Sequence, residues 1–419
     1  MILNQFNKLI LRYTIVTIIV FTLFYLKTPH NSITIGDEQR YIDYANGLWE
    51  GKYSPSFPNV YIWNGPGYPI FLMPFVKIGM NVIGLRILNC LMYLIAIIIF
   101  DRLISRKFTV KLANFVILFL AAYFPIYLEI TQAITESITF LLIVLFLNEY
   151  YKEQKNYFVI GLIFGFLVLT KAILGFILLL LLIIHLLMFI SNRSVENKFN
   201  FKVFIVAFLL NVPYLTYTYS LTGKLFYWAN SGGVSLYWMT SPHEGEFGDW
   251  PSIYFADKLL YDTKKLDSLH LAEIKHVCSF PMSLRDDEYR KISVNNIKNH
   301  PVKYIRNYIS NFQRFFFNMP NSYSKHREIM MWYFPFTIFM FLGFILVLWN
   351  FMKVNFKLNR TRFALSLILV SYVFLSCLVF AYPRFLNPIV PLIILLAFEV
   401  IREHLLSFNE LFIHPNDKG

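Results

Sequence analysis

An acidic pair, Asp37-Glu38, stands at the start of a segment with the periodicity of a short helix. Residues 41, 44, 45, 48 and 49 are apolar or aromatic and fall on one helical face, so residues 36–49 are expected to form an amphipathic helix. A carboxylate there could accept a proton from an attacking hydroxyl group. The structural alternative is that Asp37 caps the helix and that Glu38 complements its dipole.

Three further charged residues stand at breaks between apolar runs. They are Glu136 in Thr135-Glu136-Ser137, Lys171 in Leu169-Thr170-Lys171, and Arg384 in Tyr382-Pro383-Arg384-Phe385. A guanidinium group offers a donor fork that matches phosphate, and an ammonium group offers a point charge. Each residue also has a structural alternative: a carboxylate at a helix start, a lysine that snorkels, and an arginine that fixes a helix end.

The apolar runs between these residues define the class of protein. Of the 419 residues, 57% are hydrophobic and only 15% are charged, which excludes a soluble enzyme, a disordered chain and a disulfide-stapled secreted module. The runs lie near 9–26, 82–104, 110–128, 134–150, 157–170, 172–190, 202–219, 331–351, 362–380 and 386–405. Because about 20 apolar residues cross a bilayer, we expect an all-α integral membrane protein with about ten transmembrane helices.

Basic residues predict the topology. The net charge is +13, but Lys and Arg mostly flank apolar runs, which indicates positive-inside sorting and anionic lipid rather than nucleic acid. Basic residues stand on both sides of 157–190, so both flanks should be cytoplasmic and this stretch should be a hairpin broken near Lys171. Both termini are then cytoplasmic. The segments 27–81 and 220–330 are then outside, together with the short turns at 129–134, near 171 and at 381–386, and Glu136 opens a helix at its outer end.

This topology divides the chain into three parts. Residues 1–219 hold helices 1–7 and the first outer loop 27–81, residues 220–330 form a large extracytoplasmic segment, and residues 331–419 hold helices 8–10 and a cytoplasmic tail. Residues 289–327 contain eight Lys and Arg and no acidic residue. Apolar residues at 305, 308, 309, 312, 315 and 316 form a helical stripe there, which predicts a basic amphipathic juxtamembrane helix on the outer leaflet.

The first outer loop resembles that of a known family, the polytopic C-type membrane glycosyltransferases. The resemblance is to the branch of protein O-mannosyltransferases and aminoarabinose transferases, and it rests on two motifs: Asp37-Glu38-Gln39-Arg40-Tyr41 and the turn Pro66-Gly67-Tyr68-Pro69. The turn at Lys171 is similar to the family's Leu-Thr-Lys/Arg-Pro turn, with Ala172 in place of proline. The Arg384 turn is similar to its Arg-Phe…Pro…Pro turn. Asn64-Gly65 stands where some relatives carry a second acidic residue.

The resemblance implies a glycosyltransferase in the plasma (inner) membrane with an extracytoplasmic active site. Its donor would be a polyprenyl-phosphate sugar, and its acceptor a glycan, a lipid or a protein. Transfer would invert the anomeric centre, with Asp37 as the general base and Glu38 as its partner. Neither a metal nor another cofactor is expected, nor is nucleic acid a partner. The expected substrate-binding residues are Arg40, Tyr44, Tyr68, Glu136, Lys171 and Arg384.

The alternative is a lipid-linked sugar flippase or a small-solute transporter, which ten helices would also suit. The apolar runs hold few charged residues and no matching pair of broken helices. The outer segment 220–330 is also long for a carrier. Both features favour the enzyme.

Overall fold

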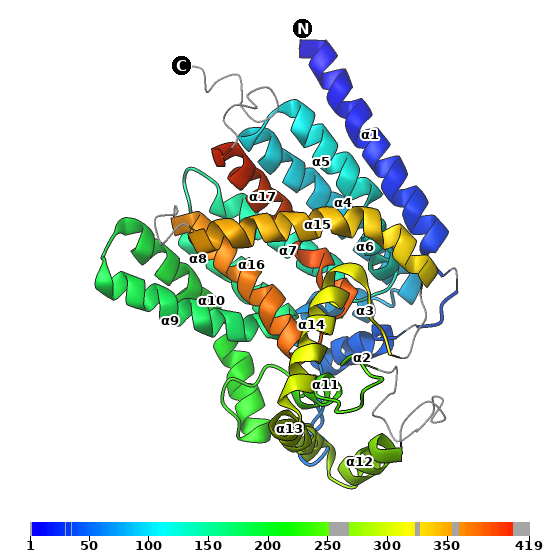
Figure 1. The fold of residues 1–419 in the computed structure, drawn as a ribbon. Coiled ribbons are helices and arrows are strands. Elements are labelled where there is room, and N and C mark those ends of the chain that lie inside the picture. The colour runs from blue at the N-terminus through cyan, green and yellow to red at the C-terminus, as the bar shows by residue number, and fades with distance from the viewer. Residues whose placement is uncertain are drawn as a thin grey trace.

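The computed structural model describes residues 2–29, 31–34, 36–250, 268–322, 327–353 and 360–404. Within these ranges the regular structure is helical and includes no strand, as the sequence predicts. Figure 1 shows the long apolar helices gathered in one body, with the shorter helices α2 (Glu38–Trp49) and α11 (Gly232–Met239) to α13 (Met282–Asn299) at one end of it.

Each of the ten predicted apolar runs contains a helix. The helices are α1 (Ile2–Lys27), α4 (Val82–Lys107), the pair α5 (Val110–Ala122) and α6 (Phe124–Ile130), α7 (Glu136–Tyr150), α8 (Tyr157–Thr170), α9 (Ile173–Ser191), α10 (Val195–Thr222), α15 (Arg327–Lys353), α16 (Arg360–Val379) and α17 (Val390–His404). Two 3-10 turns, η2 (Pro383–Phe385) and η3 (Asn387–Ile389), precede α17.

Fewer than ten of these helices are long enough to cross a bilayer. Among the described residues, seven helical segments have the length and apolarity of a membrane span, and there are eight if α5 and α6, bent by 49°, count as one. Helices α7 and α8 have 15 and 14 residues. At 1.5 Å per residue each is about 21–23 Å long, against a hydrocarbon core of about 30 Å. Ten complete spans therefore stay a prediction.

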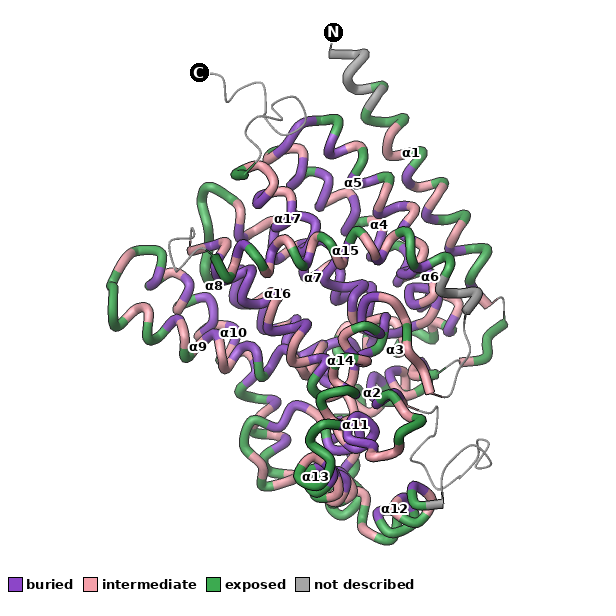
Figure 2. Tube along the Cα trace, viewed as in Figure 1, coloured by how far each residue is buried: buried purple, intermediate pink, exposed green. Residues whose placement is uncertain are grey.

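The core of the body is built around α7. Most residues of α7 are buried, and it packs against α4, α8 and α17. Figure 2 shows that burial continues into α16 and α17, whereas α1 and α9 carry many exposed positions. The exposed large side chains of α1 and α9 include Leu11, Ile18, Phe176 and Leu187. Such apolar outer faces suit contact with lipid and would be costly in water.

The break predicted near Lys171 is present. Helix α8 ends at Thr170, α9 begins at Ile173, and Lys171 lies in an extended conformation between them. Asn156 begins α8 by accepting hydrogen bonds from the backbone N–H groups of Phe158 and Val159 (2.9 and 3.4 Å). The stretch 157–190 therefore consists of two separate helices.

The amphipathic helix predicted in the outer segment is α14 (Pro301–Phe317), and its apolar stripe faces two environments. Phe316 packs on Phe341 of α15, with ring centroids 5.3 Å apart, and Phe312 stacks on Phe374 of α16 at 6.1 Å. Ile305 and Ile309 are 58% and 51% exposed. The aromatic half of the stripe therefore belongs to the protein core, and only the first half is exposed.

The end of α4, the start of α16 and the residue after α7 meet at Glu399 in the last turns of α17. Glu399 pairs with Lys107 at the end of α4 (2.7 Å) and with Arg362 at the start of α16 (3.4 Å). It also accepts a hydrogen bond from Tyr151, which follows α7 (2.8 Å). Helix α7 begins at Glu136 and ends beside this cluster. The basic cluster and Glu136 therefore lie at opposite ends of α7.

Cys278 lies in the predicted outer segment 220–330 and provides a test of the topology. Cys278 at the end of α12 (Ser268–Cys278) is exposed, while Cys90 and Cys377 are buried. We expect a membrane-impermeant maleimide to label the wild-type protein in sealed right-side-out vesicles. In a Cys278→Ser, Glu196→Cys variant, residue 196 should be labelled only after permeabilisation. Labelling of residue 196 in sealed vesicles would move the outer segment to the cytoplasmic side.

Candidate active site

Asp37 occupies the N-cap position of α2, but its side chain makes no capping hydrogen bond. Arg384, in η2, instead approaches with Nη2 at 3.2 Å from Oδ2 of Asp37. Arg40, one turn further along α2, donates to the other carboxylate oxygen. The carboxylate therefore lies between two guanidinium groups from opposite ends of the sequence, and the capping alternative does not describe its side chain.

A second ion pair lies beside the first. Nζ of Lys171 is 2.8 Å from Oε1 of Glu136, and Nε of Arg384 is 3.9 Å from the same oxygen. Glu136 is the first residue of α7 and is almost fully buried. The charged residues that the sequence places in four separate outer turns are thus joined in one network, with Arg384 between the two carboxylates.

The glycine turn of the first loop holds this network against the turn after α8. A Cβ atom on Gly65 would lie 2.1 Å from the carbonyl oxygen of Leu169, and one on Gly67 would lie 2.4 Å from Oγ1 of Thr170. Only glycine permits the two segments to approach so closely. The segment around Pro66 therefore packs directly on the residues that precede Lys171.

Electrostatics keep the carboxyl group of Asp37 ionised. Burial acts to raise its pKa, but the charges of Arg384, Arg40 and Lys171, with the hydrogen bond from Arg384, outweigh burial and hold the pKa below its usual value. Asp37 is therefore a carboxylate at neutral pH. Loss of either guanidinium contact would make it a stronger base.

Glu38 lies apart from this network, in a buried ion pair. Nε and Nη2 of Arg86 contact its two carboxylate oxygens at 2.9 and 2.7 Å, and both side chains are fully buried. The backbone N–H of Ala133 donates to Oε1 of Glu38 at 2.7 Å. Arg86 also donates to the carbonyl oxygens of residues 29, 31 and 33. Glu38 thus ties the start of α2 to α4 and to the turn before α7.

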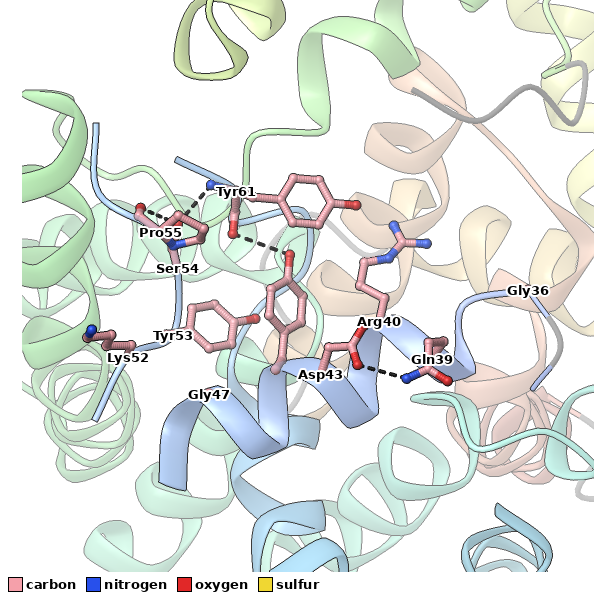
Figure 3. A pocket seen from close by; sticks show the side chains of 11 residues that line it. Gly36, Gln39, Arg40, Asp43, Gly47, Lys52, Tyr53, Ser54, Pro55 and Tyr61 are labelled. Atoms are coloured by element: carbon pink, nitrogen blue, oxygen red, sulfur yellow. Dashed lines mark hydrogen bonds between the residues drawn. The ribbon is translucent and has the colours of Figure 1, made fainter. Parts of the chain in front are cut away.

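The two tyrosines expected to bind substrate have different surroundings. Tyr68 is fully buried; its hydroxyl donates to Oδ1 of Asn89 (3.0 Å), and its ring meets Tyr41 edge-on at 5.2 Å. Tyr44 instead lines a pocket between α2 and residues 52–61, together with Arg40 (Figure 3). Tyr68 is therefore a buried packing residue next to the site, whereas Tyr44 lines the pocket.

One acidic residue near the site was not singled out from the sequence. Glu129, in the last turn of α6, is only 9% exposed and interacts electrostatically with Glu136, Arg384, Lys171 and Asp37. Its signal in the sequence is a carboxylate that directly follows the apolar run 110–128, and acidic residues at membrane depth usually mark functional sites.

Together, the described residues define a helical multi-pass membrane protein with an ionic site at one end of its helical body. No family model matches the sequence, and a search of curated proteins finds no match. Among solved structures, the chain is similar to ArnT from Cupriavidus metallidurans, crystallised with undecaprenyl phosphate. The TM-score is 0.41 at 12% sequence identity, over 88% of this chain and 77% of ArnT. A likeness of that degree does not assign a function.

Proposed function

We propose that this protein is a membrane glycosyltransferase that moves a sugar from a polyprenyl-phosphate donor to an acceptor on the extracytoplasmic face. The observation that most supports this proposal is the contact between Asp37 and Arg384, with the Lys171–Glu136 pair beside it. A base and phosphate-binding cations are the groups that such a transfer needs next to one another. The first loop, whose motifs resemble those of C-type glycosyltransferases, supplies Asp37 and Arg40 to this site.

In the proposed reaction, an acceptor hydroxyl attacks the anomeric carbon of the donor sugar. The new bond joins the acceptor oxygen to that carbon, and the bond from the carbon to the phosphate oxygen breaks. Its electron pair leaves with the polyprenyl phosphate, while the acceptor proton passes to the Asp37 carboxylate. A single displacement of this kind inverts the anomeric centre.

Arg384 and Lys171 are proposed to bind the departing phosphate. Nε of Arg384 is buried and has no hydrogen-bond partner among the described residues, so it retains a donor for an oxyanion. Lys171 adds a second cation, and the N-terminus of α7 at Glu136 adds a favourable dipole for an anion. Positioned donors of this kind stabilise charge that develops in the transition state.

Donor binding would also activate the base. When the phosphate takes hydrogen bonds from Arg384, the Asp37 carboxylate shares its strongest cationic neighbour, and its pKa rises. The base therefore strengthens when the donor is in place. We propose that Glu38 acts by positioning: its ion pair with Arg86 fixes the chain on both sides of Asp37.

An extracytoplasmic site accounts for a lipid-linked donor, because nucleotide sugars are not supplied on that face. We propose that the protein lies in the plasma membrane and that both of its termini are cytoplasmic. The cluster around Glu399 supports this orientation, since it gathers Lys107 and Arg362 at the opposite end of α7 from Glu136.

The deciding experiment uses purified protein in sealed liposomes with a panel of radiolabelled polyprenyl-phosphate hexoses and pentoses. Envelope fractions of a deletion strain supply the acceptors, so that acceptors modified in the wild type are unmodified at the start. We expect label to move from lipid to an acceptor fraction. Movement of labelled lipid between leaflets without transfer would instead support the flippase alternative.

A further inference from the structure

The first outer loop contains a pocket of about 520 Å³ that has no role in the transfer as proposed above. It lies between α2 and residues 52–61, and Figure 3 shows side chains from both segments pointing into it. Gly36 and Arg40 line one end, and these residues flank Asp37 in the sequence. Arg40 donates to Asp37 as well. The pocket and the proposed base therefore share a wall.

Three tyrosine rings form one side of the pocket. Tyr44 lies 4.6 Å from Tyr53 and 6.0 Å from Tyr61 between ring centroids, with interplanar angles of 31° and 33°. The hydroxyl of Tyr44 accepts from the backbone N–H of Trp63 (2.9 Å), and that of Tyr53 donates to the carbonyl oxygen of Asn64 (2.7 Å). These bonds fix two of the rings, so the wall is rigid before a ligand arrives.

Polar side chains also line the pocket. Nε2 of Gln39 donates to Oδ1 of Asp43 at 2.7 Å, and Asp43 is exposed on α2. A carboxylate has about four acceptor positions, so Asp43 can accept hydrogen bonds from hydroxyl groups in addition to the one from Gln39. Lys52 contributes a cationic donor at the rim.

This combination suits a sugar ring. A sugar has an apolar C–H face, which packs on an aromatic ring, and a rim of hydroxyl groups, which carboxylate and amide side chains bind. The volume also falls within the range of about 300–1,000 Å³ that is common for small-ligand sites.

We propose that this pocket binds the acceptor and that the acceptor is a carbohydrate. The inference rests on the proposed function and adds the acceptor class to it. The sugar ring lies on the tyrosine wall, its hydroxyl groups bind Asp43, and the reacting hydroxyl faces the end of the pocket that Gly36 and Arg40 form. From there its proton passes to Asp37, with the bond changes given above.

Steady-state kinetics with donor and acceptor varied separately test the proposal. Tyr61→Ala should raise the KM for the acceptor about tenfold, because it removes the most exposed of the three rings, while the KM for the donor stays unchanged. Tyr61→Phe, which keeps the ring, should behave as the wild type. Asp43→Asn should also raise only the acceptor KM. The matched control is Phe57→Ala, an exposed aromatic of the same segment that does not line the pocket.

Binding without donor separates this inference from the proposed function. In saturation-transfer NMR, wild-type protein in detergent should bind at least one of maltotriose, mannotriose and chitotriose, and Tyr61→Ala should lose that signal. Glycan binding that survives in Tyr61→Ala, or acceptor and donor KM values that rise together, would overturn the pocket assignment. Absence of sugar transfer by a wild-type protein that binds glycan in the pocket would overturn the proposed function alone.

Discussion

Asp37→Asn should reduce turnover by roughly 10²-fold or more while the protein stays folded. The amide keeps the size of the carboxylate and can still accept a hydrogen bond from Arg384, but it cannot take the acceptor proton. Asn caps helices about as well as Asp, and the Asp37 side chain makes no capping bond in any case. A loss of activity would therefore indicate the loss of the proton acceptor and not a loss of helix stability. The measurement is kcat, with the thermal midpoint in detergent recorded in parallel.

The matched control for this substitution removes a negative charge from the same helix. Glu50→Gln changes an exposed carboxylate at the end of α2, outside the ionic network, and should leave kcat unchanged. A folded Asp37→Asn protein that transfers sugar at the wild-type rate would contradict the proposed mechanism. That result would also remove the main reason for assigning a catalytic role to the first loop.

The structure changes how a substitution of the neighbouring residue, Glu38, must be interpreted. From the sequence, Glu38 is expected to be the partner of Asp37, and a Glu38→Gln variant would test that role. In the fold, Glu38 pairs with Arg86 where both side chains are fully buried. Removing one partner of such a pair leaves a buried charge and costs about 3–5 kcal/mol. The variant therefore belongs in a stability experiment, since its activity would reflect unfolding as well as chemistry.

The apolar runs predict the helices because a bilayer demands long apolar segments with satisfied backbone groups. The basic flanks and the turns then place Asp37, Glu136, Lys171 and Arg384 on one face, and the structure joins these residues directly. The sequence brings these residues together because successive helices cross the membrane in alternating directions, which determines which helix ends share a face. This holds even for Asp37 and Arg384, which are about 350 positions apart.

Other features depend on tertiary contacts that periodicity does not encode. The partner of Glu38 is Arg86, which stands inside an apolar run and carries no local signal of pairing. The aromatic half of the α14 stripe has the pattern of a lipid-facing surface but packs on α15 and α16. The spacing of apolar residues shows which face of a helix avoids water, but lipid and protein interior satisfy that face equally well.

Arg384→Ala should lower kcat by about 10²- to 10³-fold, as expected when a positioned donor to a developing anion is removed. Arg384→Lys keeps the charge but loses the planar fork, so it should also act mainly on turnover and recover part of the loss. The comparison of kcat in the two variants separates geometry from charge. Wild-type kinetics in Arg384→Ala would show that the residue is only an interfacial anchor.

The pH dependence of the Arg384 variants links this residue to the base. In the wild type the pKa of Asp37 is held below its usual value, so kcat/KM should not fall with acid until the pH is below the ordinary aspartate value of about 3.9. In Arg384→Gln the largest opposing charge is lost while burial still acts to raise the pKa. The carboxylate then gains a proton at higher pH, so the acidic limb of kcat/KM should move upward. In Arg384→Lys, which retains the charge, the limb should move less. An identical limb in Arg384→Gln and the wild type would show that the protonation of Asp37 does not control the reaction.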